Sequence, residues 1–200
     1  MDQFHPTKRV LLQTLVKLLE TNNPDQINSD QVLELSGVSK GSLYHHFQDF
    51  SDLLESALVY RFGKFVDVSV EALTEIIRIA KTKEDLISGL KQVTRASQAR
   101  DIQEPRFNRI RILAFAVNNE RMKLKLSFEQ DRLTEALADL FRESIERGWG
   151  NPAMDSRTIA VMAQAYTIGR VVDDISQVQM DPEKWFYLID EILEKVFFAR

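Results

Sequence analysis

Apolar residues recur at helical spacing along most of this 200-residue chain, and no stretch shows the two-residue alternation of a β-strand. Only 7 glycines and 5 prolines interrupt the pattern, so loops are few. We therefore expect an all-α protein with about nine helices. The spacing predicts helices over residues 6–20, 28–36, 40–47, 51–81, 83–99, 105–117, 122–147, 156–175 and 182–199.

A short helix is predicted just before a tight turn at Gly37. Asn28 can cap this helix, with Gln31 reaching back to it in a capping box. Gly37 suits its end because glycine adopts the left-handed conformation without steric cost. The apolar positions expected to be buried are Val32, Leu33 and Leu35.

The helix after the turn has one apolar face and one polar face. Ser39 can cap it, and Leu43 and Phe47 lie four residues apart on a shared buried face. Gly41 lies on the exposed side, where glycine costs about 1 kcal/mol relative to alanine. Such a small, polar face suits a DNA major groove about 12 Å wide. An ordinary helical hairpin with a solvated outer face is the alternative.

The run Gly-Val-Ser-Lys-Gly-Ser-Leu-Tyr-His-His-Phe, residues 37–47, resembles the DNA-binding signature of the TetR family of transcriptional regulators. The resemblance implies a three-helix helix-turn-helix DNA-binding domain over residues 1–50, which continues into the start of the helix 51–81. A helical effector-binding and dimerisation domain would follow over residues 51–200. It also implies a repressor that a small-molecule effector releases from a palindromic double-stranded operator. The alternative is a helical protein-interaction adaptor that binds neither DNA nor ligand.

The family's DNA contacts can be carried over to matching residues of this chain. Lys40 and Gly41 would face base edges together with His45, and Lys40 is the best candidate for guanine recognition. One departure is Phe50, because the family commonly has a lysine just after the reading helix. Phosphates would be held by Ser29, Ser39, Ser42, Tyr44 and His46.

In this family the second domain holds an effector among its helices. A small apolar or amphipathic effector is expected, although plain core packing is an alternative role for every candidate. Arg111 lies in an apolar run, where it either meets a buried partner or ligand or is a surface arginine with a buried stem. The candidate lining residues are Phe65, Ser69, Phe107, Arg111, Phe115 and Tyr166.

The last two long helices, about residues 156–175 and 182–199, carry more apolar surface than one packed side requires. Small residues, including Ala163 and Gly169, would permit close approach of another helix. We expect these helices to pair with a second copy as a four-helix bundle, which the family resemblance also implies. A central core helix is the alternative. Two reading helices about 34 Å apart, or a multiple of that, would match a palindromic operator.

One long helix, residues 51–81, carries apolar positions for two cores. Its first half would pack on the reading head and its second half on the effector domain. We therefore expect a ligand to displace this helix and to change the spacing of the two heads.

The composition offers little for catalysis. The chain has no cysteine and three histidines, of which His45 and His46 point about 100° apart on a helix and suit a shared metal poorly. Glycine-rich phosphate loops and nucleophile elbows are missing from the sequence. We expect no enzyme activity, no metal and no cofactor. No stretch reaches about 18 uninterrupted apolar residues, so a cytoplasmic protein without membrane spans is expected.

Charge is an unusual feature of this predicted DNA-binding protein. The net charge is −4, and residues 1–50 contain four Lys/Arg against six Asp/Glu. Binding would therefore depend on local geometry, on helix N-termini and on hydroxyl groups rather than on a basic surface.

We predict a shallow dependence of operator affinity on salt concentration. Few counterions would be released by a head with so few basic residues, so the slope of log affinity against log salt should be smaller than for a basic domain. Fluorescence anisotropy between about 50 and about 300 mM salt measures this slope. Over this range the Debye length falls from about 14 Å to about 6 Å. A steep loss of affinity would contradict the prediction.

Overall fold

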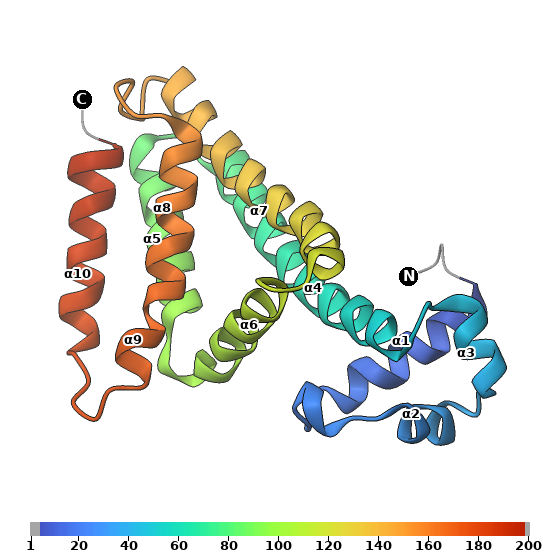
Figure 1. Cartoon of the computed structure of the whole chain (residues 1–200). Helices are drawn as coiled ribbons and strands as arrows, with labels where there is room; N and C mark the ends of the chain where they lie inside the picture. The colour runs from blue at the N-terminus through green and yellow to red at the C-terminus, as the bar shows by residue number, and fades with distance from the viewer. Residues whose placement is uncertain (1–4, 199–200) are drawn as a thin grey trace. The chain divides into compact units, whose positions relative to one another are not determined.

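The computed structural model describes residues 5–198, and this part of the chain is helical throughout, with turns and loops between the helices. The fold class is therefore all-α, as the spacing predicts. The chain forms two compact units (Figure 1), one built from residues 1–64 and 115–127 and the other from residues 65–114 and 128–200. The first unit includes the start of α4, into which the expected head was to continue, and also the separate segment 115–127.

The first unit is a three-helix head with two added segments. Its helices are α1 (Pro6–Leu18), the short η1 (Pro24–Gln26), α2 (Ser29–Ser36) and α3 (Lys40–His46), followed by the start of α4 (Phe50–Ile79). Leucines of α1 and apolar residues of α2, α3 and α4 form one buried core. Its most deeply buried members are Leu11, Leu12, Leu15, Val32, Leu43, Leu53, Ala57 and Phe62.

The second unit contains the remaining helices. In chain order they are α5 (Lys83–Gln98), η2 (Arg100–Ile102), α6 (Gln103–Ala116), α7 (Glu120–Glu146), α8 (Ser156–Gly169), α9 (Val171–Asp174), α10 (Pro182–Ile192) and η3 (Leu193–Phe197). Helix α5 packs against both α8 and α10 (Figure 1).

A buried ion pair fixes helix α6 in the second unit. The Arg106 guanidinium donates two hydrogen bonds to the Asp174 carboxylate of α9, at 2.7 and 2.9 Å, and both side chains are at most 4% exposed. The same guanidinium also donates to the carbonyl of Ala99. A buried pair of this kind is tolerated only when further hydrogen bonds satisfy it, so the rotation of α6 about its axis is well determined.

Three details differ from the sequence-based expectations. Leu35 is 64% exposed and lies outside the core, because Val32 already fills the inner face of the two-turn helix α2. The helix expected over residues 156–175 is broken at Arg170, which separates α8 from α9. The helix expected over 182–199 ends its α-helical part at Ile192 and continues as the wider turn η3, and residue 199 lies outside the described residues.

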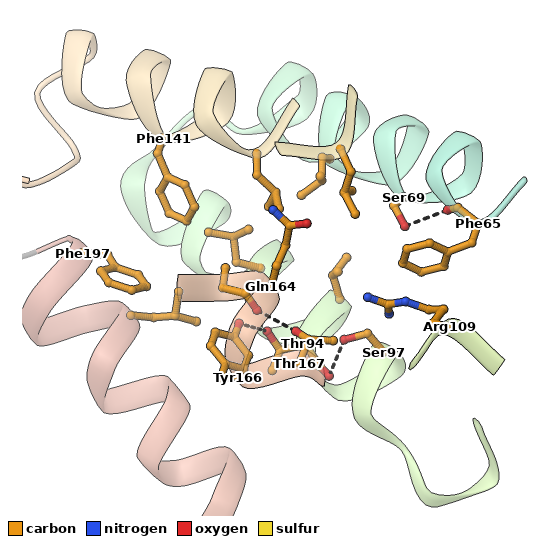
Figure 2. A pocket seen from close by; sticks show the side chains of 17 residues that line it. Phe65, Ser69, Thr94, Ser97, Arg109, Phe141, Gln164, Tyr166, Thr167 and Phe197 are labelled. Carbon is orange, nitrogen blue, oxygen red and sulfur yellow. Dashed lines mark hydrogen bonds between the residues drawn. The ribbon is translucent and has the colours of Figure 1, made fainter. Parts of the chain in front are cut away.

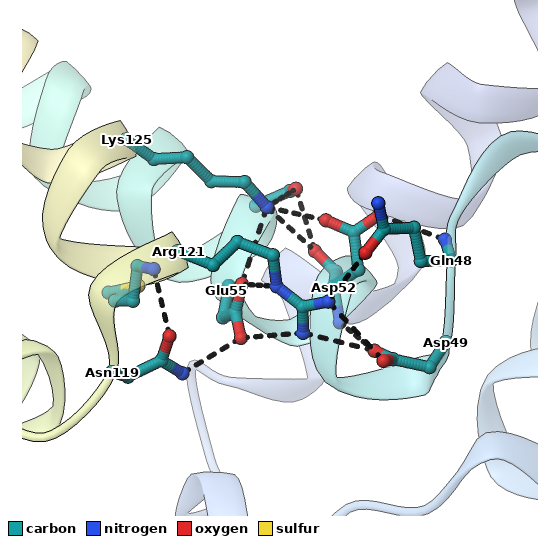
Figure 3. Close-up of polar contacts among 9 residues, drawn as sticks. Gln48, Asp49, Asp52, Glu55, Asn119, Arg121 and Lys125 are labelled. Atoms are coloured by element: carbon teal, nitrogen blue, oxygen red, sulfur yellow. Dashed lines mark hydrogen bonds and ion pairs between the residues drawn. The ribbon is translucent and has the colours of Figure 1, made fainter.

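A polar cluster in the first unit joins the start of α7 to the start of α4 (Figure 3). Glu55 is 1% exposed and accepts hydrogen bonds from Arg121 Nε at 2.7 Å and from Asn119 Nδ2 at 2.9 Å. Arg121 also bonds Asp49, while Lys125 pairs with Asp52. The segment 115–127 is therefore held to the head by charge-assisted hydrogen bonds as well as by packing.

This cluster keeps its carboxylates ionised. Burial disfavours the charged form of Glu55, but hydrogen bonds from Arg121 and Asn119 and the charge of Lys125 outweigh burial and lower its pKa. Hydrogen bonds from Arg121 and from the Asp52 amide lower the pKa of Asp49 in the same direction. A carboxylate with a lowered folded-state pKa stabilises the protein above its ordinary pKa, and this stabilisation is lost as pH falls through the folded-state value.

We predict that Glu55→Gln lowers the free energy of unfolding by about 2 kcal/mol at pH 7, because Arg121 loses the charged carboxylate of Glu55 as a hydrogen-bond acceptor. The exposed pair Asp139 and Arg142 provides a control, and Asp139→Asn should change stability by less than about 1 kcal/mol. Urea unfolding followed by circular dichroism measures both variants. The deficit of Glu55→Gln should shrink as pH falls below 4.5; a deficit that is constant from pH 7 to pH 3 would contradict the role of ionised Glu55.

Candidate functional site

The local signals around α2 and α3 act as the sequence predicts. Asn28 caps α2 in a capping box with Gln31, the reciprocal bonds both being 3.0 Å long. Gly37 ends α2 in the left-handed region, at φ 66°. Ser39 then caps α3, where its hydroxyl accepts from the Ser42 amide at 3.2 Å. These caps set both ends of the turn between the two helices.

Helix α3 presents its two faces as expected. Leu43 is fully buried and Phe47 is 3% exposed, and Lys8 of α1 places its ammonium 5.0 Å from the centre of the Phe47 ring. Tyr44, by contrast, is 46% exposed. A Cβ added at Gly41 would meet no atom within 4 Å, so the backbone of α3 is open to solvent there. The remaining exposed members of this face are Lys40 and His45, with Ser42 and His46 half-buried beside it.

Histidine rings gather at the end of α3 nearest α1. The ring of His46 lies 4.7 Å from that of His5, which caps α1, and 5.0 Å from that of His45. Burial lowers the pKa of His46, and the charges of His5, His45 and Lys8 lower it further. Within residues 5–198, no three histidine or acidic side chains gather closely enough to hold a metal ion.

The second unit contains a pocket between α4, α5, α6, α7, α8 and η3 (Figure 2). It encloses about 120 Å³ and is mostly apolar. Of the predicted effector residues, Phe65, Ser69 and Tyr166 line it. Further lining residues include Leu73, Leu90, Thr94, Arg109, Leu133, Leu137, Phe141, Gln164, Thr167 and Phe197.

The other three predicted effector residues are not among those that line this pocket. Arg111 is exposed on α6 and donates to the Asn108 amide oxygen at 3.1 Å, with Glu104 3.5 Å away. It is therefore a surface arginine, the alternative that its apolar surroundings left open. Phe115 is 42% exposed and belongs to the first unit, and Phe107 is half-buried outside the pocket lining.

Arg109 is the functional candidate that sequence reasoning missed. Its guanidinium points into the pocket and stacks on Phe65, with Cζ 3.9 Å from the ring centre (Figure 2). Burial lowers the pKa of Arg109 to about 10, and the charge of Arg106 acts in the same direction. Apolar residues occur on every side of α6, so the sequence could not show which of its arginines faces inward.

None of the helices among residues 5–198 combines the length and the apolar character that crossing a bilayer requires.

The described residues thus form a helix-turn-helix head and a helical unit with an internal pocket, and this arrangement can be compared with known proteins. No protein-family model matches the chain. The nucleoid occlusion factor SlmA of Alteromonas mediterranea is 27% identical over 169 residues, which is 80% of each chain.

Solved structures resemble the whole chain. A Mesorhizobium loti protein assigned to the TetR family of transcriptional regulators has a TM-score of 0.69 at 14% identity and covers 94% of this chain and 93% of its own. A Saccharomonospora viridis transcriptional regulator in complex with choline has a TM-score of 0.68 at 14% identity and covers 96% and 98%. The chain therefore has the TetR-family transcriptional regulator fold, as the resemblance of residues 37–47 predicts.

We predict that Gly41→Ala separates stability from DNA binding. The open space at this position accepts the methyl group, and alanine favours the helix, so the free energy of unfolding should rise by up to about 1 kcal/mol. If α3 lies in a DNA groove, as the sequence predicts, DNA affinity should fall, because the added methyl group would stand between the backbone of α3 and the groove. Thermal unfolding and gel shift measure the two effects. An unchanged gel shift would show that the backbone at Gly41 does not approach DNA.

Proposed function

We propose that this protein is a sequence-specific DNA-binding transcriptional regulator of the TetR family, and not an enzyme. The observation that carries the proposal is the outer face of α3. Its inner residues Leu43 and Phe47 are buried, while Lys40, Gly41 and Tyr44 are exposed on its outer side. Lysine offers a donor to guanine, and the exposed tyrosine hydroxyl can reach a phosphate.

In this proposal Lys40 and Gly41 read base edges together with His45. Ser29, Ser42 and Tyr44 hold phosphates, as do Ser39 and His46. Ser39 has a second task, since its hydroxyl already caps α3 and lies 3.0 Å from the hydroxyl of Ser42. Its contact with a phosphate would therefore use the remaining hydrogen-bonding capacity of the hydroxyl.

We further propose that the protein acts as a homodimer through α8 and α10. Apolar side chains on these helices are exposed, among them Val161, Met162, Tyr187 and Leu188. Helices of a soluble protein rarely present so much apolar surface without a partner. Two copies joined here would present two α3 helices, which suits a palindromic operator.

The proposed regulation is repression that a small ligand relieves. The pocket is lined by Phe65, Ser69 and Leu73 of α4, the helix whose first turns belong to the DNA-binding unit. The choline complex of the Saccharomonospora viridis neighbour supports a small-molecule ligand for this fold. A ligand that moves α4 would change the spacing of the two α3 helices and weaken operator binding.

Selection of bound duplexes from a random DNA pool tests the function directly. A regulator should enrich a palindrome with half-sites one or more helical turns apart, whereas an adaptor or an enzyme should enrich nothing. Light scattering of the free protein should give the mass of a dimer.

We predict that Tyr44→Ala weakens the gel shift on the selected palindrome at least tenfold, because ring and hydroxyl are both removed from the exposed face. Tyr44→Phe removes only the hydroxyl, so its DNA affinity should lie between that of Tyr44→Ala and that of the wild type. Circular dichroism and light scattering should show both variants folded and dimeric. An unchanged gel shift for Tyr44→Ala would refute the role given to Tyr44.

A further inference from the structure

The pocket of the second unit contains a cation without an anionic partner. Two arginines of α6 differ in their partners. Arg106 forms an ion pair with Asp174, whereas Arg109 forms no ion pair with any residue among 5–198. No aspartate or glutamate is among the residues that line the pocket. Arg109 is half-buried, and withdrawing a cation from water costs free energy unless a counter-charge or hydrogen bonds compensate it.

The hydrogen bonds of Arg109 are also incomplete. Its Nε–H is buried and has no acceptor in the described part of the chain. The nearby hydroxyls are already engaged by their own helices, since Ser97 donates to the carbonyl of Thr94 and Ser69 to that of Phe65. The structure thus leaves an inward-facing donor group for something that enters the pocket.

Among residues 5–198, the contact that compensates this charge is with the Phe65 ring. The guanidinium lies 3.9 Å from the ring centre, a close cation–π contact. This contact covers the ring face that another cation would use. Even with its pKa lowered to about 10, Arg109 is protonated at neutral pH, so the pocket repels cationic ligands.

We infer that the pocket binds a small amphipathic anion, whose acidic head group pairs with Arg109 and whose apolar body lies against residues such as Leu90, Leu133 and Phe141. A carboxylate matches the planar guanidinium with two parallel hydrogen bonds, and a sulfonate offers the same charge with a different shape. The volume of about 120 Å³ is close to that of a cavity that binds benzene, roughly 150 Å³. The body of the ligand therefore corresponds to about one ring.

This inference deepens the proposed effector pocket and is tested by ligand binding to the full-length protein without DNA. The probes share a phenyl body and differ in head group: phenylacetate, phenylmethanesulfonate, 2-phenylethanol and 2-phenylethylammonium. Calorimetry should give at least tenfold tighter binding of one or both anions than of the alcohol, and the weakest binding for the ammonium ion. Binding of phenylacetate alone would identify a carboxylate site, and binding of both anions a site for monoanions in general.

Arg109→Met should reduce affinity for the anions at least tenfold and leave affinity for 2-phenylethanol equal or higher. Arg111→Gln, two positions along α6 and exposed, is the matched control and should stay within twofold of the wild type. If Arg109→Met does not fold, Arg109→Lys is the second variant, because it keeps the positive charge. It should bind the anions more weakly than the wild type does, but still more tightly than the alcohol, with the ammonium ion weakest.

Two results would overturn the inference: anions that bind no tighter than the alcohol, or an anion preference that survives in Arg109→Met. Because DNA is left out of the titration, these results do not depend on operator binding. If the protein prefers the anions but selects no palindrome, the proposed function is contradicted and the inferred ligand class is still supported.

Discussion

The seven-residue helix α3 is too short to be stable alone, so its stability depends on packing against the rest of the first unit. Burial of Leu43 and Phe47 holds it in place and fixes which side chains face outward. The Ser39 cap and the left-handed Gly37 set the angle at which it leaves α2. Ser39 is exposed and also caps the helix, whereas the exposed residues Lys40, Tyr44 and His45 are not needed to hold α3 in place.

The helix-turn-helix pair could be predicted from the sequence because its signals are local. Asn28 with Gln31, Gly37 and Ser39 act over three or four residues, and each adopts the predicted role. Leu35 was expected in the core, but a two-turn helix buries only one stripe, and Val32 occupies it. The resemblance of residues 37–47 pointed to the TetR-family fold, which no local argument could supply.

The pocket and the Glu55 cluster could be predicted only in part, because they depend on contacts far apart in the sequence. Phe65, Ser69 and Tyr166 were among the candidates for the pocket that the family resemblance implies, and they line it. The inward position of Arg109 depends on the rotation of α6, which the ion pair between Arg106 and Asp174 sets. Glu55 resembles a solvent-facing charge of an amphipathic helix. Its partners Asn119 and Arg121 lie 64 and 66 residues away, beyond the reach of any pattern.

The cluster around Glu55 also limits how the first unit could be exchanged between proteins. The first unit is discontinuous in sequence, since residues 115–127 return to it and supply Arg121 and Lys125. A chimera that exchanged only the first 64 residues with a relative would pair Glu55 with foreign counter-ions or with none. Units of this kind can be swapped between proteins only together with the segment 115–127, so recombination is constrained at two places in the chain rather than one.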